Sequence, residues 1–262
     1  MNEALRAEIR RRVGIVVALA AYDDDNSDAH KSLELELRFG ELDARGAFVA
    51  GLPAGLWYAL FQYMYRSPST RTRSEFSMME RDEQLADVRV LHTRTHCGCV
   101  RQRKSPLAPK ITVPLFDDAR GMTSSAMVRV ATSRETRLTG DACAGVPLIS
   151  IPQCIFRRRE RRSIYLIDSA TGMRSCWRFD FTRINDNQAY ELELELNVRQ
   201  VFRQLPDAEV SVRSDAVVRQ LDSLLVCLSQ SLVEANRVYQ QHQSQMAAQR
   251  AAEVERLRPR AT

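Results

Sequence analysis

Two strings in which glutamate alternates with leucine constrain the fold of this chain more than any other feature. The first, LELELRFG, covers residues 33–40, and the second, YELELELN, covers residues 190–197. Side chains at every second position of a β-strand lie on the same face of the sheet. Each string therefore predicts a strand with an apolar leucine face and a charged or polar opposite face.

The rows of glutamate on these two strands indicate a bound cation. Glutamate is a poor strand former, and neighbouring carboxylates on one face repel each other. A single such strand is usually a solvated outer strand, because polar-out alternation is common in antiparallel sheets. Two of them favour a cation site. Oxygen ligands without histidine or cysteine are typical of Mg²⁺ or Mn²⁺, so we predict such an ion beside Glu34, Glu36, Glu191, Glu193 and Glu195.

Other strand-like segments carry basic side chains at alternate positions. They are CVRQRKS, MVRVATSRET, CIFRRRERRSIYL and WRFDFTRI. Arginine is suited to bidentate recognition of phosphate oxygens. A barrel lined with both charges would therefore suit a polyphosphate and its metal ion. The charged residues predicted to share these faces are Arg101, Arg103, Arg129, Glu135, Arg157, Arg159, Arg161, Arg178 and Asp180.

Strand-like segments fill the middle of the chain, and helical patterns lie toward both ends. Short connections between the strands predict antiparallel hairpins. The predicted fold class is α+β, a closed antiparallel β-barrel tunnel of eight or slightly more strands. Flanking helices are predicted near the N-terminus, over residues 53–66 and from residue 215 to about 257. We divide the chain into a helix with a polar linker, a catalytic domain, and a C-terminal helix with a polar tail, covering residues 1–28, 29–205 and 206–262.

The composition limits the classes of ligand and the cellular compartment that are compatible with this chain. Lys and Arg total 38 against 33 for Asp and Glu, and this basic excess favours an anionic ligand. The six cysteines include no C-x-x-C pair, so we predict an intracellular, reducing compartment. The apolar run at residues 13–21 is too short to span a bilayer, and no membrane association is predicted.

The ordered set of strands resembles the metal-dependent RNA triphosphatases of fungi, protozoa and large DNA viruses, which belong to the triphosphate tunnel metalloenzymes. LELELRFG is similar to their first glutamate motif and YELELEL to their last, with VRVATSRE, RRRERRS and WRFDFT between them. The resemblance covers roughly residues 30–200. It implies hydrolysis of the γ-phosphate of 5′-triphosphate RNA to leave a diphosphate end, the first step of mRNA capping.

The resemblance also implies individual roles for the acidic residues. Glu34 and Glu36 would ligate Mg²⁺ or Mn²⁺ directly, together with Glu195 from the facing strand. Glu191 and Glu193 would hold metal-bound water or neighbouring basic groups.

The remaining roles concern the phosphate and the attacking water. Arg159 and Arg161 would grip the terminal phosphate, and Glu135 would orient the water. Asp180 would support the lining. Arg159 departs from the family pattern, where lysine is common, and arginine changes the reach and hydrogen-bond geometry. Further phosphate contacts are predicted for Arg38, Arg101, Arg103, Arg129, Arg157 and Arg178.

Three other interpretations stay open on the sequence alone. The tunnel motifs report a triphosphate and not what is attached to it, so inorganic tripolyphosphate and nucleoside triphosphates are alternative substrates. A non-catalytic RNA-binding module would display the arginines on an open sheet. A zinc site is the third, because HTRTHCGC places four N and S ligands close together. These are His92, His96, Cys97 and Cys99.

The predicted partner is RNA with a 5′-triphosphate end. We expect guanylyltransferase activity to belong to a separate partner protein, and a homodimer is compatible with this interpretation. A capping component would work in the nucleus or, if the chain is viral, at a viral replication site or in the virion.

Overall fold

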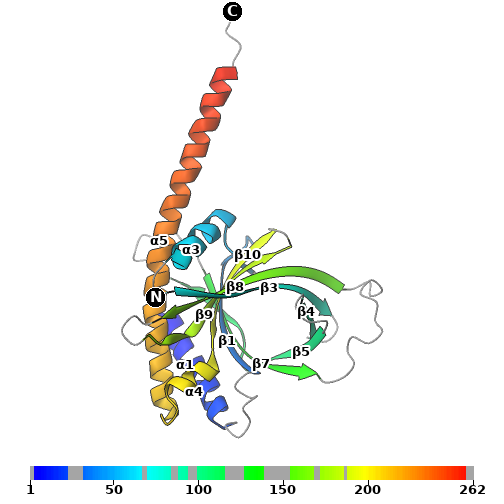
Figure 1. Cartoon of the computed structure of the whole chain (residues 1–262), viewed down its shortest axis with the longest axis vertical. Helices are drawn as coiled ribbons and strands as arrows, with labels where there is room; N and C mark the ends of the chain where they lie inside the picture. The colour runs from blue at the N-terminus through cyan, green and yellow to red at the C-terminus, as the bar shows by residue number, and fades with distance from the viewer. Residues whose placement is uncertain are drawn as a thin grey trace, which may run out of the picture.

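The computed structural model contains helices toward both ends of the chain and strands between them (Figure 1). The residues that it describes are 3–22, 32–66, 70–83, 88–93, 99–115, 127–138, 154–167, 172–185 and 188–257. The helices are α1 (Glu3–Tyr22), α3 (Ala54–Arg66), α4 (Val198–Gln204) and α5 (Val210–Leu257). The strands are β1 (Leu33–Leu42), β2 (Phe48–Ala50), β3 (Thr70–Glu83), β4 (Val88–Thr93), β5 (Cys99–Pro106), β6 (Ile111–Pro114), β7 (Met127–Leu138), β8 (Cys154–Ile167), β9 (Arg174–Ile184) and β10 (Ala189–Leu196).

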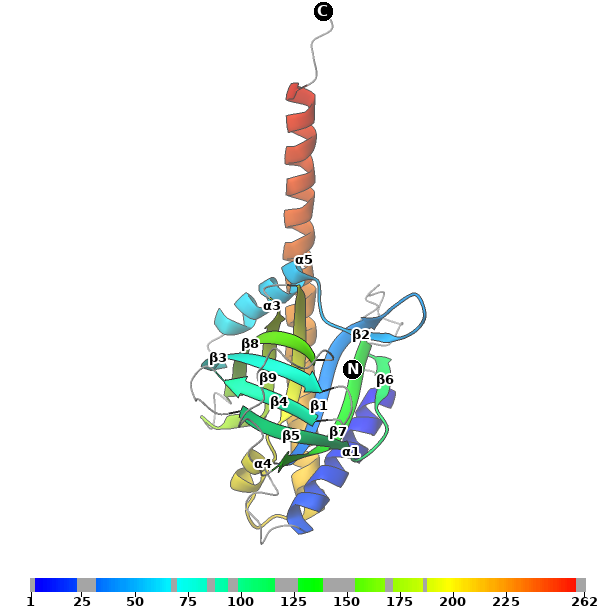
Figure 2. The same cartoon turned by 90° about the vertical axis from the view of Figure 1, so that its right-hand side faces the viewer.

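All ten strands belong to one antiparallel sheet. Their order is β2-β1-β10-β9-β8-β3-β4-β5-β7-β6, and Figure 2 shows β3, β4 and β5 side by side. Strand β1 pairs with β10 along one edge and with β7 along the other. Followed through these pairings, eight strands form a circuit that returns to its start: β1, β10, β9, β8, β3, β4, β5 and β7. The predicted α+β class with an antiparallel sheet is confirmed.

The main hydrophobic core lies between the leucine face of the sheet and the helices. Every leucine of the two alternating strings is at most 3 % exposed. They are Leu33, Leu35, Leu37, Leu192, Leu194 and Leu196. Burying a leucine side chain stabilises a fold by roughly 1.5–3 kcal/mol, so this layer fixes which face of β1 and β10 is left for the charged residues. A one-residue slip would exchange the two faces.

Helices α1 and α5 cover this layer and contact each other. In α1, the buried residues Leu5, Ile9 and Val13 recur at helical spacing and form one apolar stripe. The buried residues of α5 include Leu221, Leu225 and Leu228 from its first half. Its second half projects beyond the body of the molecule (Figure 1).

Two elements differ from the sequence-based expectation. The alternation of the second glutamate string continues to residue 199 and predicts a strand to that point, but β10 ends at Leu196 and α4 begins at Val198. Asn197 causes the change, because its side chain accepts a hydrogen bond of 3.1 Å from the Gln200 backbone N–H and so caps the helix. Helix α5 begins at Val210 and not at 215, because the polar sequence SVRSD hides the apolar helical period.

Helix α3 fixes the other end of β10. The indole Nε1 of Trp57 donates a hydrogen bond of 3.0 Å to the carbonyl oxygen of Glu191. The Trp57 ring also packs edge-on against Phe181 of β9. Both contacts lie on the outer side of the sheet, so they hold the Glu191 backbone while its side chain faces the other way.

Among the described residues, no helix combines the length and the apolar character that crossing a bilayer requires.

Candidate functional site

The two glutamate strings lie next to each other in the sheet. Glu36 is the Cα partner of Glu195, and Arg38 is the partner of Glu193. The resemblance predicted strands that face each other across the barrel, whereas β1 and β10 are hydrogen-bonded neighbours. Their glutamates therefore share one continuous face, and all five are at least three-quarters buried.

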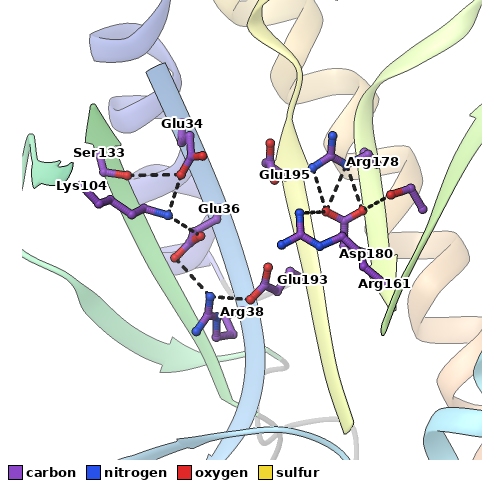
Figure 3. A network of polar contacts seen from close by, with 11 residues as sticks. Glu34, Glu36, Arg38, Lys104, Ser133, Arg161, Arg178, Asp180, Glu193 and Glu195 are labelled. Carbon is purple, nitrogen blue, oxygen red and sulfur yellow. Dashed lines mark hydrogen bonds and ion pairs between the residues drawn. The ribbon is translucent and has the colours of Figure 1, made fainter. Parts of the chain in front are cut away.

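A lysine lies between the first two of these carboxylates (Figure 3). The Lys104 Nζ atom is 2.5 Å from Glu34 Oε2 and 3.0 Å from Glu36 Oε2. On the other side of Glu34, the Ser133 hydroxyl donates a hydrogen bond of 3.5 Å to the same Oε2 atom. These residues come from β1, β5 and β7, so three strands build this part of the site.

Arg38 continues the same cluster along β1. Its guanidinium forms an ion pair with Glu193 of β10, and its Nη2 atom lies 3.8 Å from Glu36 Oε1. Arg38 thus connects the carboxylates of the two neighbouring strands. Lys104 and Arg38 hold Glu36 from two sides. We refer to Glu34, Glu36, Arg38, Lys104 and Glu193 as the β1 cluster.

A second cluster surrounds Asp180 on β9, whose side chain is fully buried. The Ser163 hydroxyl donates a hydrogen bond of 2.6 Å to Asp180 Oδ1, and Arg178 Nη2 donates one of 2.8 Å to Oδ2. Arg161 Nη1 lies 3.6 Å from Oδ2. Arg178 Nη2 also lies 2.6 Å from Glu195 Oε2. We refer to Ser163, Arg178, Asp180, Arg161 and Glu195 as the β9 cluster (Figure 3).

Burial of the carboxylates shifts their ionisation. Burial is the main cause that raises the pKa of Glu34 to about 7, and the nearby Glu135 and Glu36 add to it against the effect of Lys104. Burial likewise raises the pKa of Glu195 to about 7, although Arg178 opposes it. The pKa of Glu193 is also raised, again mainly by burial. Extra positive charge near these groups would therefore favour their ionised form.

The basic groups respond in the opposite sense. Burial acts to lower the pKa of Lys104, but the charges of Glu36 and Glu34 outweigh it and hold the pKa above its ordinary value. Arg178 behaves in the same way beside Glu195 and Asp180. Both cations stay charged, so each cluster is a set of buried ion pairs.

Two further predicted residues lie beside the β1 cluster on β7. Glu135 is the Cα partner of Lys104, and its charge helps to raise the pKa of Glu34. Arg129 is the Cα partner of Arg38, and its guanidinium lies 4.7 Å from the centroid of the Phe48 ring. Burial lowers the pKa of Arg129, and repulsion by Arg38 adds to the effect.

Strand β5 differs from the expected arrangement. The sequence pattern predicts Arg101 and Arg103 on the lined face, but Arg103 is exposed and its neighbour Lys104 reaches the carboxylates. Because adjacent side chains of a strand point to opposite faces, Arg103 and Lys104 cannot both lie on the lined face. Lys104 was missed because CVRQRKS carries basic residues at both odd and even positions, so the sequence does not say which set faces inward.

Several predicted residues lie where side chains are not described. Arg101, Arg157 and Arg159 belong to β5 and β8, but only their backbone is described. The same holds for His92 and Cys99, while His96 and Cys97 lie outside the described residues.

The donors of the two clusters fit a hard divalent cation. Glu34, Glu36 and Glu195 offer only carboxylate oxygens, the ligands that Mg²⁺ and Mn²⁺ prefer. Among the described residues, no three acidic, histidine or cysteine side chains converge as a ready-made metal site. The reason is visible in the contacts, because Lys104 holds two of these carboxylates and Arg178 holds the third. A metal ion would have to exchange places with chain cations.

Comparisons with known proteins place the fold. No family model and no curated protein matches the sequence. Among solved structures, the S. pombe RNA triphosphatase Pct1 in complex with the Spt5 CTD matches with a TM-score of 0.50 and 12 % identity, over 82 % of this chain and 91 % of that one. Pct1 alone gives a TM-score of 0.49 at 13 % identity over 80 % and 91 %. The mimivirus capping enzyme triphosphatase gives 0.44 at 13 % over 88 % and 98 %.

The circuit of strands and the match to Pct1 in its Spt5 complex define the class of fold. The chain has the triphosphate tunnel fold, as the sequence resemblance predicted. The particular proteins whose structures it resembles are RNA triphosphatases of a fungus and of a giant virus. At these identities the likeness concerns the fold, and the chemistry has to be argued from the two clusters.

Proposed function

We propose that this chain is a metal-dependent RNA 5′-triphosphatase, which removes the γ-phosphate from triphosphate RNA ends within a closed tunnel formed by the eight-stranded circuit. The observation that carries the proposal is the joint presence of buried carboxylates and buried cations on the charged face of the neighbouring strands β1 and β10. A face with one sign of charge would bind the ion or the phosphate. A face with both signs can bind them together.

The carboxylates that would hold Mg²⁺ or Mn²⁺ are Glu34, Glu36 and Glu195. The bound ion would neutralise charge on the phosphate oxygens, which lowers the barrier to attack by water. Glu191 and Glu193 are almost fully buried on β10, where they could hold water or basic groups beside the ion.

The chain's own cations would position the phosphate. Arg161 and Arg178 are held on the rigid carboxylate of Asp180, with side chains about one-fifth exposed. Cations that are fixed before the substrate arrives stabilise developing negative charge without reorganising. Glu135, close to Glu34, is the proposed residue that orients the attacking water.

A direct assay tests the proposal. Phosphate release from 5′-triphosphate RNA would be measured with Mg²⁺ or Mn²⁺ for the unchanged chain, Glu36→Ala and Glu195→Ala. We expect the two variants to lose at least about a hundredfold in rate, because each removes a ligand of the charge-neutralising ion. Equal rates in all three proteins would exclude this site.

The attached group is tested separately. Tripolyphosphate and ATP would be assayed beside triphosphate RNA under the same conditions. Faster release from RNA supports the proposed substrate, and faster release from tripolyphosphate or ATP would assign the same site to a different substrate.

A further inference from the structure

Lys104 reaches the carboxylates of β1 from a strand that is not a neighbour of β1. Strand β7 pairs with β1 on one side and with β5 on the other, so the lysine extends across β7 to reach Glu34 and Glu36. Its Nζ atom ends between their Oε2 atoms, at 2.5 and 3.0 Å (Figure 3). A single ammonium is thus shared by the two proposed metal ligands on β1.

An ammonium and a metal ion compete for the same oxygens. A Mg²⁺ or Mn²⁺ ion lies about 2.1 Å from its oxygen ligands, closer than Lys104 Nζ lies to either carboxylate. Both cations cannot lie between these two side chains, because they would be within a few ångströms of each other and repel strongly. One of them must leave when the other binds.

The chemistry of lysine makes it the group that moves. Its ammonium is a point charge on a flexible stem, whereas arginine is a planar fork that binds carboxylates in a fixed geometry. The two clusters differ in this respect, because Arg178 donates to both oxygens of Asp180 through two nitrogen atoms. Lys104 has only one side-chain nitrogen atom, so no second nitrogen fixes the orientation of its side chain.

We propose that Lys104 is a placeholder cation, which occupies the metal position between Glu34 and Glu36 in the metal-free protein and is displaced when the metal binds. This inference rests on the proposed function. The placeholder stabilises two buried carboxylates that would otherwise repel each other, and it weakens the apparent affinity for metal. Once displaced, its ammonium is available to a phosphate oxygen, so metal binding prepares phosphate binding.

The test measures metal affinity and thermal stability without any substrate. Mn²⁺ binding at pH 8 would be followed by the loss of free Mn²⁺ in electron paramagnetic resonance, for the unchanged chain, Lys104→Met and Lys104→Arg. Arg45→Met is the control, because Arg45 is exposed in the β1–β2 turn and the substitution removes the same charge. Melting temperatures would be recorded with and without Mn²⁺.

The two lysine variants are expected to act in opposite directions. Lys104→Met should bind Mn²⁺ at least about tenfold more tightly, because no ammonium has to leave. Its metal-free melting temperature should fall by roughly 5–10 °C, because two buried carboxylates lose their partner, and Mn²⁺ should restore it. Lys104→Arg should keep the metal-free stability and bind Mn²⁺ several-fold more weakly. Arg45→Met should match the unchanged chain.

The outcomes separate this inference from the proposed function. If the unchanged chain binds Mn²⁺ and Lys104→Met binds it equally or more weakly, the placeholder role is wrong and the metal site stands. If the unchanged chain binds no Mn²⁺, both are wrong. If Lys104→Met does not fold without metal, Lys104→Arg still decides, because equal or tighter Mn²⁺ binding by that variant contradicts the placeholder.

Discussion

The β1 cluster and the β9 cluster use the same chemical groups in different ways. In the β9 cluster, two guanidiniums and a hydroxyl converge on the fully buried Asp180. In the β1 cluster, the single ammonium of Lys104 contacts both Glu34 and Glu36. Buried ion pairs resist change when each member has several partners with fixed geometry. Under the proposed function, the β9 cluster would be the rigid half, which positions phosphate and supplies Glu195 to the metal, and the β1 cluster would be the adjustable half, which accepts the metal at Glu34 and Glu36.

The largest expected effect concerns the rigid half. Asp180→Ala leaves Arg178 and Arg161 without their shared carboxylate, and loss of one member of a buried ion pair costs about 3–5 kcal/mol in the free energy of unfolding. Urea denaturation would measure it, with Asp207→Ala, an exposed site, as the control. Mn²⁺ should leave this loss in place, although it should offset that of Lys104→Met. Equal rescue of both variants would remove the distinction between the clusters.

A second effect concerns pH and spans both clusters. The pKa of Glu34 and that of Glu195 lie at about 7, above the ordinary 4.5. Protons compete with metal for these carboxylates, so Mn²⁺ affinity should weaken between tenfold and a hundredfold from pH 8 to pH 6. An Mn²⁺ affinity that stays constant from pH 6 to pH 8 would contradict the titration of Glu34 and Glu195 in this range. Glu36→Gln should keep most of the pH dependence of Mn²⁺ affinity, because Glu34 and Glu195 remain.

The same two carboxylates predict how stability depends on pH when no metal is bound. A carboxylate whose pKa is higher in the folded state contributes stability below its unfolded pKa and loses it as the pH rises through the folded pKa. The metal-free chain should therefore unfold at a lower urea concentration at pH 8 than at pH 5.5. Added Mn²⁺ should reduce this difference.

A smaller effect is expected for Arg178→Lys. The positive charge remains, but a single ammonium cannot reproduce the two-nitrogen contact in which Nε and Nη2 of Arg178 donate to Asp180 at 2.9 and 2.8 Å while Nη2 also lies 2.6 Å from Glu195. We expect about a tenfold loss of phosphate release, with the melting temperature little changed. A loss as large as that of Glu195→Ala would mean that Arg178 does more than position its neighbours.

The smallest expected effect tests which side chains of β5 face the tunnel and which face outward. Arg103 is exposed while Lys104 reaches Glu34, so Arg103→Met should change the rate of phosphate release by less than about threefold. Single-turnover assays of Arg103→Met beside Lys104→Met would measure both. A larger effect of Arg103→Met would reverse the assignment.

The sequence predicted the parts of this arrangement that depend on strict alternation. Leu35 and Glu36 could be assigned to opposite faces because apolar and charged residues alternate without exception in their strand. The same logic failed for Lys104, because its strand carries basic residues on both faces. Alternation also does not say which strands are neighbours, so the pairing of Glu36 with Glu195 came from the structure.

Helix α4 was hidden for a different reason. Residues 197–199 continue the polar and apolar alternation of β10, so a local period of two extends beyond the true end of the strand. The cap by Asn197 decides the boundary, and a capping hydrogen bond forms only when the chain has already turned. Local pattern therefore predicted the strand and not its end.

The pairing of β1 with β10 joins the first strand of the circuit to the last. Such a contact is among the slowest to form, because the loop that it closes contains every other strand of the ring. The proposed chemistry would thus arise only after β10 has been synthesised and paired with β1. A nascent or truncated chain ending before β10 would carry Glu34 and Glu36 without Glu195, and metal binding would report that the ring has closed.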